Sequence, residues 1–328
     1  MIDGISIICF AASYGVALAL EILRLYVDNR VRVILRFGFA AAGLLAHTLY
    51  LAHRATIDAP LSSWFDWYLV AAWVLAATYV FLAVRQPKNA IGLFLLPLVL
   101  ALIGVAAGIT DRTPFSPNRA ANVWAATHGI LLLLGTVAVL IGFAAGIMYL
   151  LQAYRLKHKL LPKRGFALPP LEWLQRLNAR AIVVSVLTLG PGILAGIILN
   201  LVQHPANNPR YISWNDPTVV TSLLTALWLL TAVTFEAVYK PAREGRKVAY
   251  LTVVSFVFLL TMLLVTLIYD TGHASTGSDT GPPARATLPR GSRDLSRRSA
   301  GPRERLGFSN HRRVAAPRGL LSAEGGGR

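Results

Sequence analysis

Eight apolar runs, each about as long as a membrane-spanning helix, constrain the fold of this chain more than any other feature. A helix rises about 1.5 Å per residue, so about 20 residues cross a hydrocarbon core about 30 Å thick. Backbone amides find no water inside lipid, so runs of this length must be helical, and no short alternating strands typical of a barrel are present. We expect an all-α polytopic membrane helix bundle with about eight transmembrane helices. The runs are approximately 5–25, 33–52, 64–84, 89–109, 124–151, 180–202, 218–238 and 248–269.

Charge is scarce and clustered. Only 14% of the 328 residues are charged, whereas a soluble domain has about a quarter. The net charge of +17 invites a nucleic-acid function, but 11 of the 32 Lys and Arg residues are arginines in 271–328. Most of the others lie in short loops between apolar runs, as topology signals do. The one cysteine, Cys9, forms no intrachain disulfide, and no Cys-x-x-Cys-His haem-attachment motif is present.

The loops alternate in charge, which predicts the topology. The first, third, fifth and seventh loops are richer in Lys and Arg than the others, so the positive-inside rule places them in the cytoplasm. Both termini and the loops 53–66, 111–123 and 203–217 then face outward across the cell (inner) membrane. Basic residues follow the first apolar run without a small-residue cleavage site, so we expect a retained helix.

Two regions of different composition indicate the domain organisation. Residues 1–270 form the transmembrane bundle, whereas 271–328 are rich in Gly, Pro, Ser and Arg and poor in large apolar residues. Such a tail cannot bury enough surface to offset its ordering entropy, so we expect disorder. In the fifth loop, Leu171, Trp173, Leu174 and Leu177 have helical spacing, which predicts a short interfacial helix with Trp173 at headgroup depth.

Histidines are the candidate functional residues. The predicted topology places five of the seven at or near the outer face: His47, His53, His128, His204 and His273. Neutral imidazole is a good iron ligand, and two histidines across a cavity can ligate haem iron axially. Alternatively, a histidine at a membrane interface only hydrogen-bonds a neighbouring helix, and the residues alone leave both interpretations open.

Several segments in a fixed order resemble one family. The strongest runs from Trp124-Ala-Ala-Thr-His128 through an apolar stretch to Met148-Tyr149-Leu150-Leu151-Gln152 and Leu156-Lys157. The others are Gly43–Arg54, Pro60-Leu61-Ser62 with Trp73, Gly92–Pro97, Leu168–Glu172, Trp214-Asn215-Asp216-Pro217 with Trp228, and Gly272-His273-Ala274. Over residues 30–275 the chain resembles the cytochrome c assembly proteins, membrane haem-handling proteins that include CcsA-like and HemX-like branches.

The resemblance implies a haem site at the outer face. In the family, the histidine that opens the signature helix and the one after the last helix are axial ligands, which correspond to His128 and His273. Trp214 and Tyr211 would stack on the porphyrin and Arg210 would pair with a propionate, with His204 and His47 as further candidates. The implied cofactor is haem b, held for delivery to apocytochrome c or a partner subunit.

Departures from the family pattern keep alternatives open. The outer loop retains a single tryptophan, and Glu236 is the nearest residue to the position of an inner histidine. A HemX-like accessory or regulatory protein that binds no haem is therefore a second hypothesis. A small-molecule transporter is a third, because Gly190-Pro191 can break a helix. No catalytic triad, paired-carboxylate site, phosphate loop or zinc spacing appears, so any enzymatic role would be that of a haem lyase component.

Overall fold

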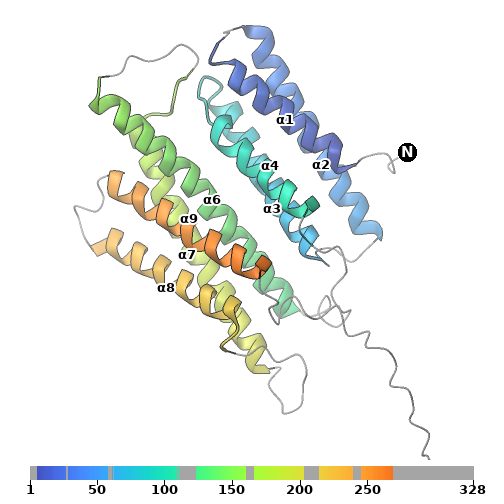
Figure 1. Cartoon of the computed structure of the whole chain (residues 1–328), viewed down its shortest axis with the longest axis vertical. Helices are drawn as coiled ribbons and strands as arrows, with labels where there is room; N and C mark the ends of the chain where they lie inside the picture. The colour runs from blue at the N-terminus through green and yellow to red at the C-terminus, as the bar shows by residue number, and fades with distance from the viewer. Residues whose placement is uncertain are drawn as a thin grey trace, which may run out of the picture. The chain divides into compact units, whose positions relative to one another are not determined.

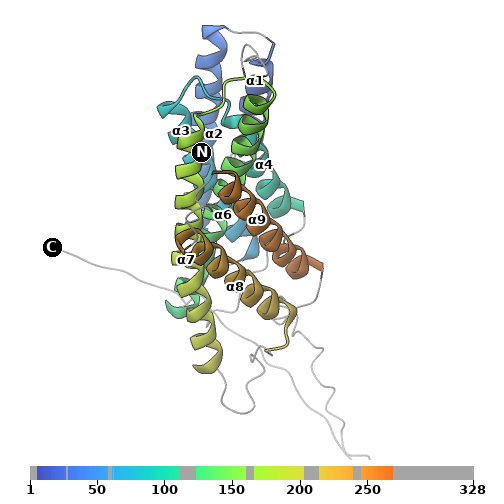
Figure 2. The same ribbon diagram turned by 90° about the vertical axis from the view of Figure 1, so that its left-hand side faces the viewer.

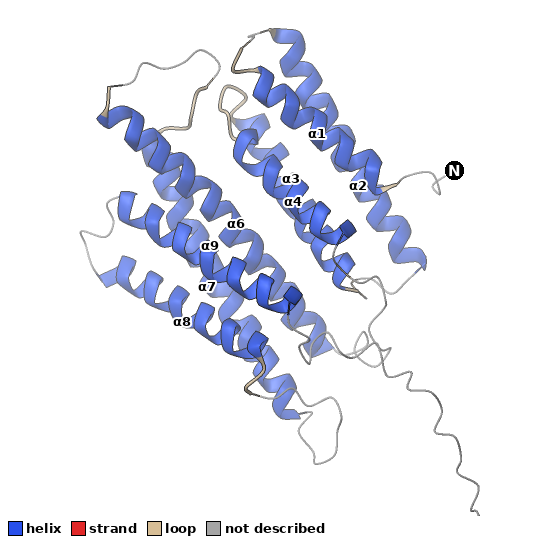
Figure 3. Ribbon diagram, viewed as in Figure 1, coloured by secondary structure: helices blue, strands red, loops and turns tan. Residues whose placement is uncertain are grey.

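A computed structural model describes residues 6–26, 29–57, 61, 63–108, 110, 123–159, 166–202, 214–238 and 245–268. Within these ranges the regular structure is entirely helical, which confirms the expected fold class (Figures 1 and 3). The helices are α1 (Ile7–Leu23), α2 (Arg30–Ile57), α3 (Trp64–Arg85), α4 (Gly92–Gly108), α6 (Val123–Lys157), α7 (Leu171–Val202), α8 (Pro217–Val238) and α9 (Gly245–Ile268).

The lengths of the helices indicate a multi-pass membrane protein. The six helices α2, α3, α6, α7, α8 and α9 are long and apolar enough to cross a membrane. The helices α1 and α4 are also apolar but have 17 residues each. Seventeen residues extend about 26 Å, which is at the lower limit for a span.

Local sequence explains where two helices begin. At α3, the Ser63 hydroxyl accepts from the Asp66 amide and the Asp66 carboxylate accepts from the Ser63 amide, which is a capping box. At α7, the helix begins directly after Pro169 and Pro170 and continues without interruption to Val202. The prediction of a separate interfacial helix at 171–177 was therefore wrong: this segment forms the first turns of α7, which has no break at Leu177 and contains Pro191 only further along.

Successive helices alternate in direction and pack as two groups of four. In the first group α1 contacts α2 and α4, and α3 contacts α2 and α4. In the second group α6 contacts α7 and α9, and α8 contacts α7 and α9 (Figure 2). The groups meet where α6 contacts α3 and α4. We call the end of the bundle at which α6 begins the His128 end, and Figure 1 shows α9 ending toward it.

Buried charges join the first group at the end remote from His128. The side chains of Glu21 and Arg36 are each 1% exposed and form an ion pair of 2.5 Å. Arg36 also donates to the Pro87 carbonyl at 3.2 Å. A Cβ on Gly92 would lie 2.7 Å from a Glu21 carboxylate oxygen, so α4 approaches this pair as closely as glycine allows. Sequence reasoning missed the pair, since its members are separated by fifteen residues and a predicted loop.

Candidate functional site

His128 lies in the second turn of α6 and its imidazole is fixed against α7. The ring nitrogen Nδ1 is 2.7 Å from the Gly192 carbonyl oxygen. A carbonyl oxygen only accepts, so Nδ1 must carry the proton and donate it. The neutral ring then has its lone pair on Nε2, which is the atom that can bind a metal ion.

A glycine of α7 makes room for this ring. A Cβ on Gly196 would lie 2.6 Å from His128 Cε1 and 2.8 Å from Nδ1. A Cβ atom does not approach a non-bonded atom this closely, so the ring packs directly on the backbone of α7 at a position that only glycine can provide. Small residues allow such close helix contacts inside a membrane.

The neighbouring part of α6 is less covered than the middle of the helix. Residues 124–134 are all partly or largely exposed, whereas Val137, Leu140, Ala145 and Met148 are buried. His128 itself is half-buried. The packed half of α6 therefore anchors the helix, while the half that carries His128 leaves side chains accessible to a ligand at this end.

His47 lies in a different environment. It is fully buried between α1 and α2, stacked on Phe10 with ring centroids 4.2 Å apart. Its Nδ1 is 3.5 Å from the Tyr14 hydroxyl, and its Nε2 has no hydrogen-bond partner within the described structure. The helix α2 does not contact α6 among the described residues. The structure therefore does not bring His47 and His128 together.

Trp214 lies three residues before the first residue of α8 and is 39% exposed. Two residues later, the Asp216 carboxylate accepts from the Thr218 amide at 2.8 Å, and Pro217 is the first residue of the helix. An acidic N-cap followed by proline is a common helix start. The segment Trp214–Pro217 therefore positions an exposed aromatic ring at the beginning of α8. The other predicted site residues, His204, Arg210, Tyr211 and His273, lie outside the described residues.

The sequence pattern of one family, described as "Cytochrome C assembly protein", matches residues 61–273. This span covers more than half of the chain and includes every helix from α3 to α9. The chain belongs to the cytochrome c assembly protein family. This confirms the resemblance on which the sequence interpretation rested and supports a role in cytochrome c biogenesis. No curated protein and no solved structure matched the chain.

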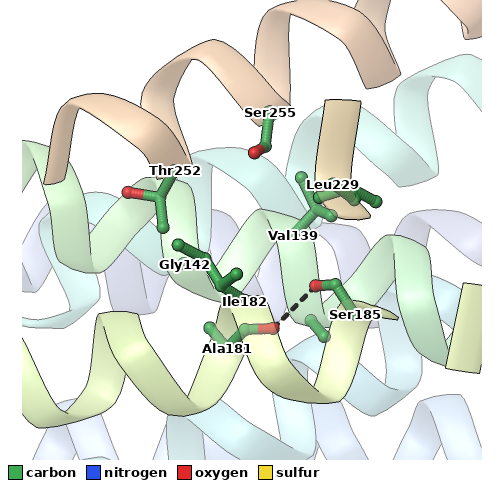
Figure 4. Close-up of a pocket in the computed structure, with 9 residues that line it drawn as sticks. Val139, Gly142, Ala181, Ile182, Ser185, Leu229, Thr252 and Ser255 are labelled. Carbon is green, nitrogen blue, oxygen red and sulfur yellow. Dashed lines mark hydrogen bonds between the residues drawn. The ribbon is translucent and has the colours of Figure 1, made fainter. Parts of the chain in front are cut away.

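In this member of the cytochrome c assembly family, four helices enclose a small cavity. Figure 4 shows its lining, with Gly142 from α6, Ser185 from α7, Leu229 from α8, and Ser255 from α9. Its volume is about 10 Å³, about that of a single water, and the Ser185 hydroxyl already donates to the Ala181 carbonyl. A cofactor the size of haem does not fit there.

Sequence reasoning missed two residues of the candidate site in this protein. Gly192 supplies the carbonyl that holds His128, and Gly196 supplies the space for its ring. Their spacing of four residues, directly after Gly190-Pro191, was the available signal, because it places both on one face of a helix. No group of three or more His, Cys, Asp and Glu residues in the described ranges is arranged to hold a metal ion.

Proposed function

We propose that the protein binds haem b at the His128 end of the bundle and holds it for cytochrome c maturation, with His128 as an axial iron ligand. The observation that carries this proposal is the hydrogen bond between His128 Nδ1 and the Gly192 carbonyl. Histidines that bind metals commonly donate their other ring N–H to a backbone carbonyl, which fixes the tautomer and the ring orientation. The donor set therefore fits a haem iron on Nε2.

The second axial ligand in this proposal is His273. The rings of Phe143 in α6 and Phe256 in α9 stack with centroids 3.9 Å apart, and the two helices run antiparallel. Moving fifteen residues from Phe143 along α6 reaches His128, and fifteen residues from Phe256 reaches position 271. The described part of α9 ends at Ile268, at about the level of His128, and His273 follows five residues later in the sequence. This register supports the pairing of the two histidines.

Aromatic and basic groups would complete the site. Trp214, at the start of α8, is half-exposed and free to present a flat face to a porphyrin. Tyr211 would stack beside it and Arg210 would pair with a propionate, while His204, two residues after the end of α7 in the sequence, remains a further candidate. The positive-inside count predicts that this end faces the outer side of the inner membrane, where apocytochrome c or a partner subunit would receive the haem.

Haem titration of the purified protein tests the proposal. We expect a Soret band in the wild type and at least about a tenfold loss of haem affinity in His128→Ala, because one axial ligand disappears. Gly196→Ala should weaken binding as well, since the new methyl group displaces the imidazole while His128 remains. His158→Ala is the matched control, because His158 follows the opposite end of α6 and its Nδ1 bonds the Tyr154 carbonyl.

Rescue separates ligand loss from misfolding. Free imidazole should restore the Soret band of His128→Ala but not that of a misfolded chain, and His273→Ala should behave like His128→Ala. Unchanged haem retention in His128→Ala would remove this residue from the site.

One observation favours a second candidate function. Trp214–Pro217 is accounted for as the capped start of α8, so this reduced motif need not contact haem. A HemX-like accessory role without haem would then produce no Soret band in a well-folded wild-type sample.

A further inference from the structure

A groove of about 370 Å³ runs between α2 and α3 near the His128 end. This volume lies within the range of small-ligand sites. The groove does not include His47 or His128, so it is separate from the proposed haem site. Its lining is almost wholly apolar and comprises Thr48, Leu51, Ala52, Arg54, Ala55, Leu61, Asp66, Val70 and Trp73.

Small side chains explain why the two helices leave this space. On α2, Thr48, Leu51, Ala52 and Ala55 follow the i, i+3, i+4, i+7 spacing of a single helix face. Ala52 and Ala55 are both exposed and too short to reach α3. In a membrane, this hollow on the surface of the two helices faces the apolar chains that surround the protein, and these chains fill it.

Two polar contacts join the helices and bracket the groove. At one end, Trp73 Nε1 donates to the Thr48 hydroxyl at 2.8 Å, and this hydroxyl donates to the Leu44 carbonyl. At the other, Arg54 Nε donates to the Asp66 carboxylate, which also caps α3. The two contacts are six residues apart on α2, or about 9 Å. They join the two helices at both ends of the groove.

The chemistry of the groove changes along its length. Near Trp73 the polar atoms are already used within the protein, so this part favours a hydrocarbon. At the far end the Arg54 side chain is 22% exposed and lies 4.9 Å above the Phe65 ring, which fixes its position. Its Nε is used by Asp66, whose carboxylate also lines the groove, so a phosphate oxygen would have to meet the outer edge of the guanidinium, whose planar donors suit that group.

We propose that this groove is a phospholipid-binding site. One segment of an acyl chain lies along Ala52, Ala55 and Val70, and the phosphodiester of the same lipid contacts Arg54. The lipid is the occupant because α2 and α3 are both long and apolar enough to span a membrane, and the groove opens on their surface. The lipid fills the space that small side chains leave, and it stabilises the packing of α2 against α3. The helix α2 precedes the segment matched to the family.

Native mass spectrometry of the full chain, extracted from membranes and washed in detergent, tests this site. We expect one phospholipid per wild-type chain after washing. Ala52→Trp fills the groove and should lower its occupancy at least about tenfold, since the hydrocarbon contacts are lost. Ala42→Trp is the matched control, because Ala42 is exposed on the same helix outside the groove and its substitution should leave the lipid in place.

Two further measurements identify the ligand. Arg54→Gln should reduce occupancy less than Ala52→Trp does and abolish any preference among headgroups, while circular dichroism shows unchanged helix content. Inorganic phosphate at millimolar concentration should not displace the lipid, which distinguishes a phospholipid from a free anion. Equal lipid retention in Ala52→Trp and Ala42→Trp, displacement by free phosphate, or a protein or second copy of the chain in place of lipid would each overturn the proposal.

Discussion

The helices α1–α4 and the helices α6–α9 are held together by different contacts. In α1–α4, charged and polar side chains cross between helices: Glu21 pairs with Arg36, and Arg54 pairs with Asp66. In α6–α9, glycines and hydroxyls bring backbones together, as where Gly146 of α6 faces Thr252 and the Ala249 carbonyl of α9. The first group adds ion pairs between helices to its apolar core, whereas the second adds close backbone contacts at glycines.

This difference explains where an adaptable ligand site can form. Buried ion pairs inside a membrane fix a geometry strongly, because an unpaired charge there is costly. Glycine packing fixes a helix only where the surfaces meet, and α6 is packed in its middle but partly exposed around His128. The second group thus combines an anchored helix with an accessible end that carries a histidine.

The largest expected effect is the loss of the buried ion pair. Glu21→Ala leaves the Arg36 guanidinium buried without its carboxylate, and we expect the free energy of unfolding to fall by about 3–5 kcal/mol. Denaturation in mixed micelles, followed by circular dichroism, measures it. Glu172→Ala is the control, since Glu172 and Arg176 form an exposed pair whose removal should cause no measurable change. Similar effects of the two substitutions would break the contrast between the groups.

A smaller effect is expected from a methyl group between α6 and α9. In Gly146→Ala the new Cβ would lie 2.6 Å from the Thr252 hydroxyl and 3.1 Å from the Ala249 carbonyl, so the helices must separate slightly. We expect a loss of about 1–3 kcal/mol in the same assay. Gly104→Ala in α4 is the control, because no atom lies within 4 Å of its Cβ position and alanine is the better helix former. Equal tolerance of both would show that the second group is not limited by close packing.

The smallest effect concerns a single hydrogen bond in the second group. Trp228 Nε1 donates to the Ser255 hydroxyl at 3.0 Å, joining α8 to α9. Trp228→Phe should cost about 0.6 kcal/mol for this bond, which is typical of one interhelical hydrogen bond in a membrane. A double-mutant cycle with Ser255→Ala isolates it, because the two changes should be less than additive. Additive effects would mean that the bond contributes nothing to holding α8 against α9.

Sequence reasoning located the helices better than their contacts. The predicted runs 64–84 and 218–238 agree with α3 and α8 to within one residue. The predicted start of the sixth run at residue 180 was nine residues late, because charged residues made the segment that begins at Leu171 look like a separate interfacial helix. His128 was recognised as a candidate ligand, but Gly192 and Gly196, which hold its ring, were not, since they lie on a partner helix more than sixty residues away.

The sequence by itself determined that this chain forms membrane helices, because eight apolar runs in lipid must satisfy their backbone hydrogen bonds internally. It also determined the family, through motifs that extend along most of the chain. Only the tertiary structure decided which faces meet: that His47 is enclosed by α1 and α2 while His128 rests on α7. In a chain that is apolar on almost every helix face, periodicity does not distinguish a face that meets lipid from one that meets another helix, so packing has to decide.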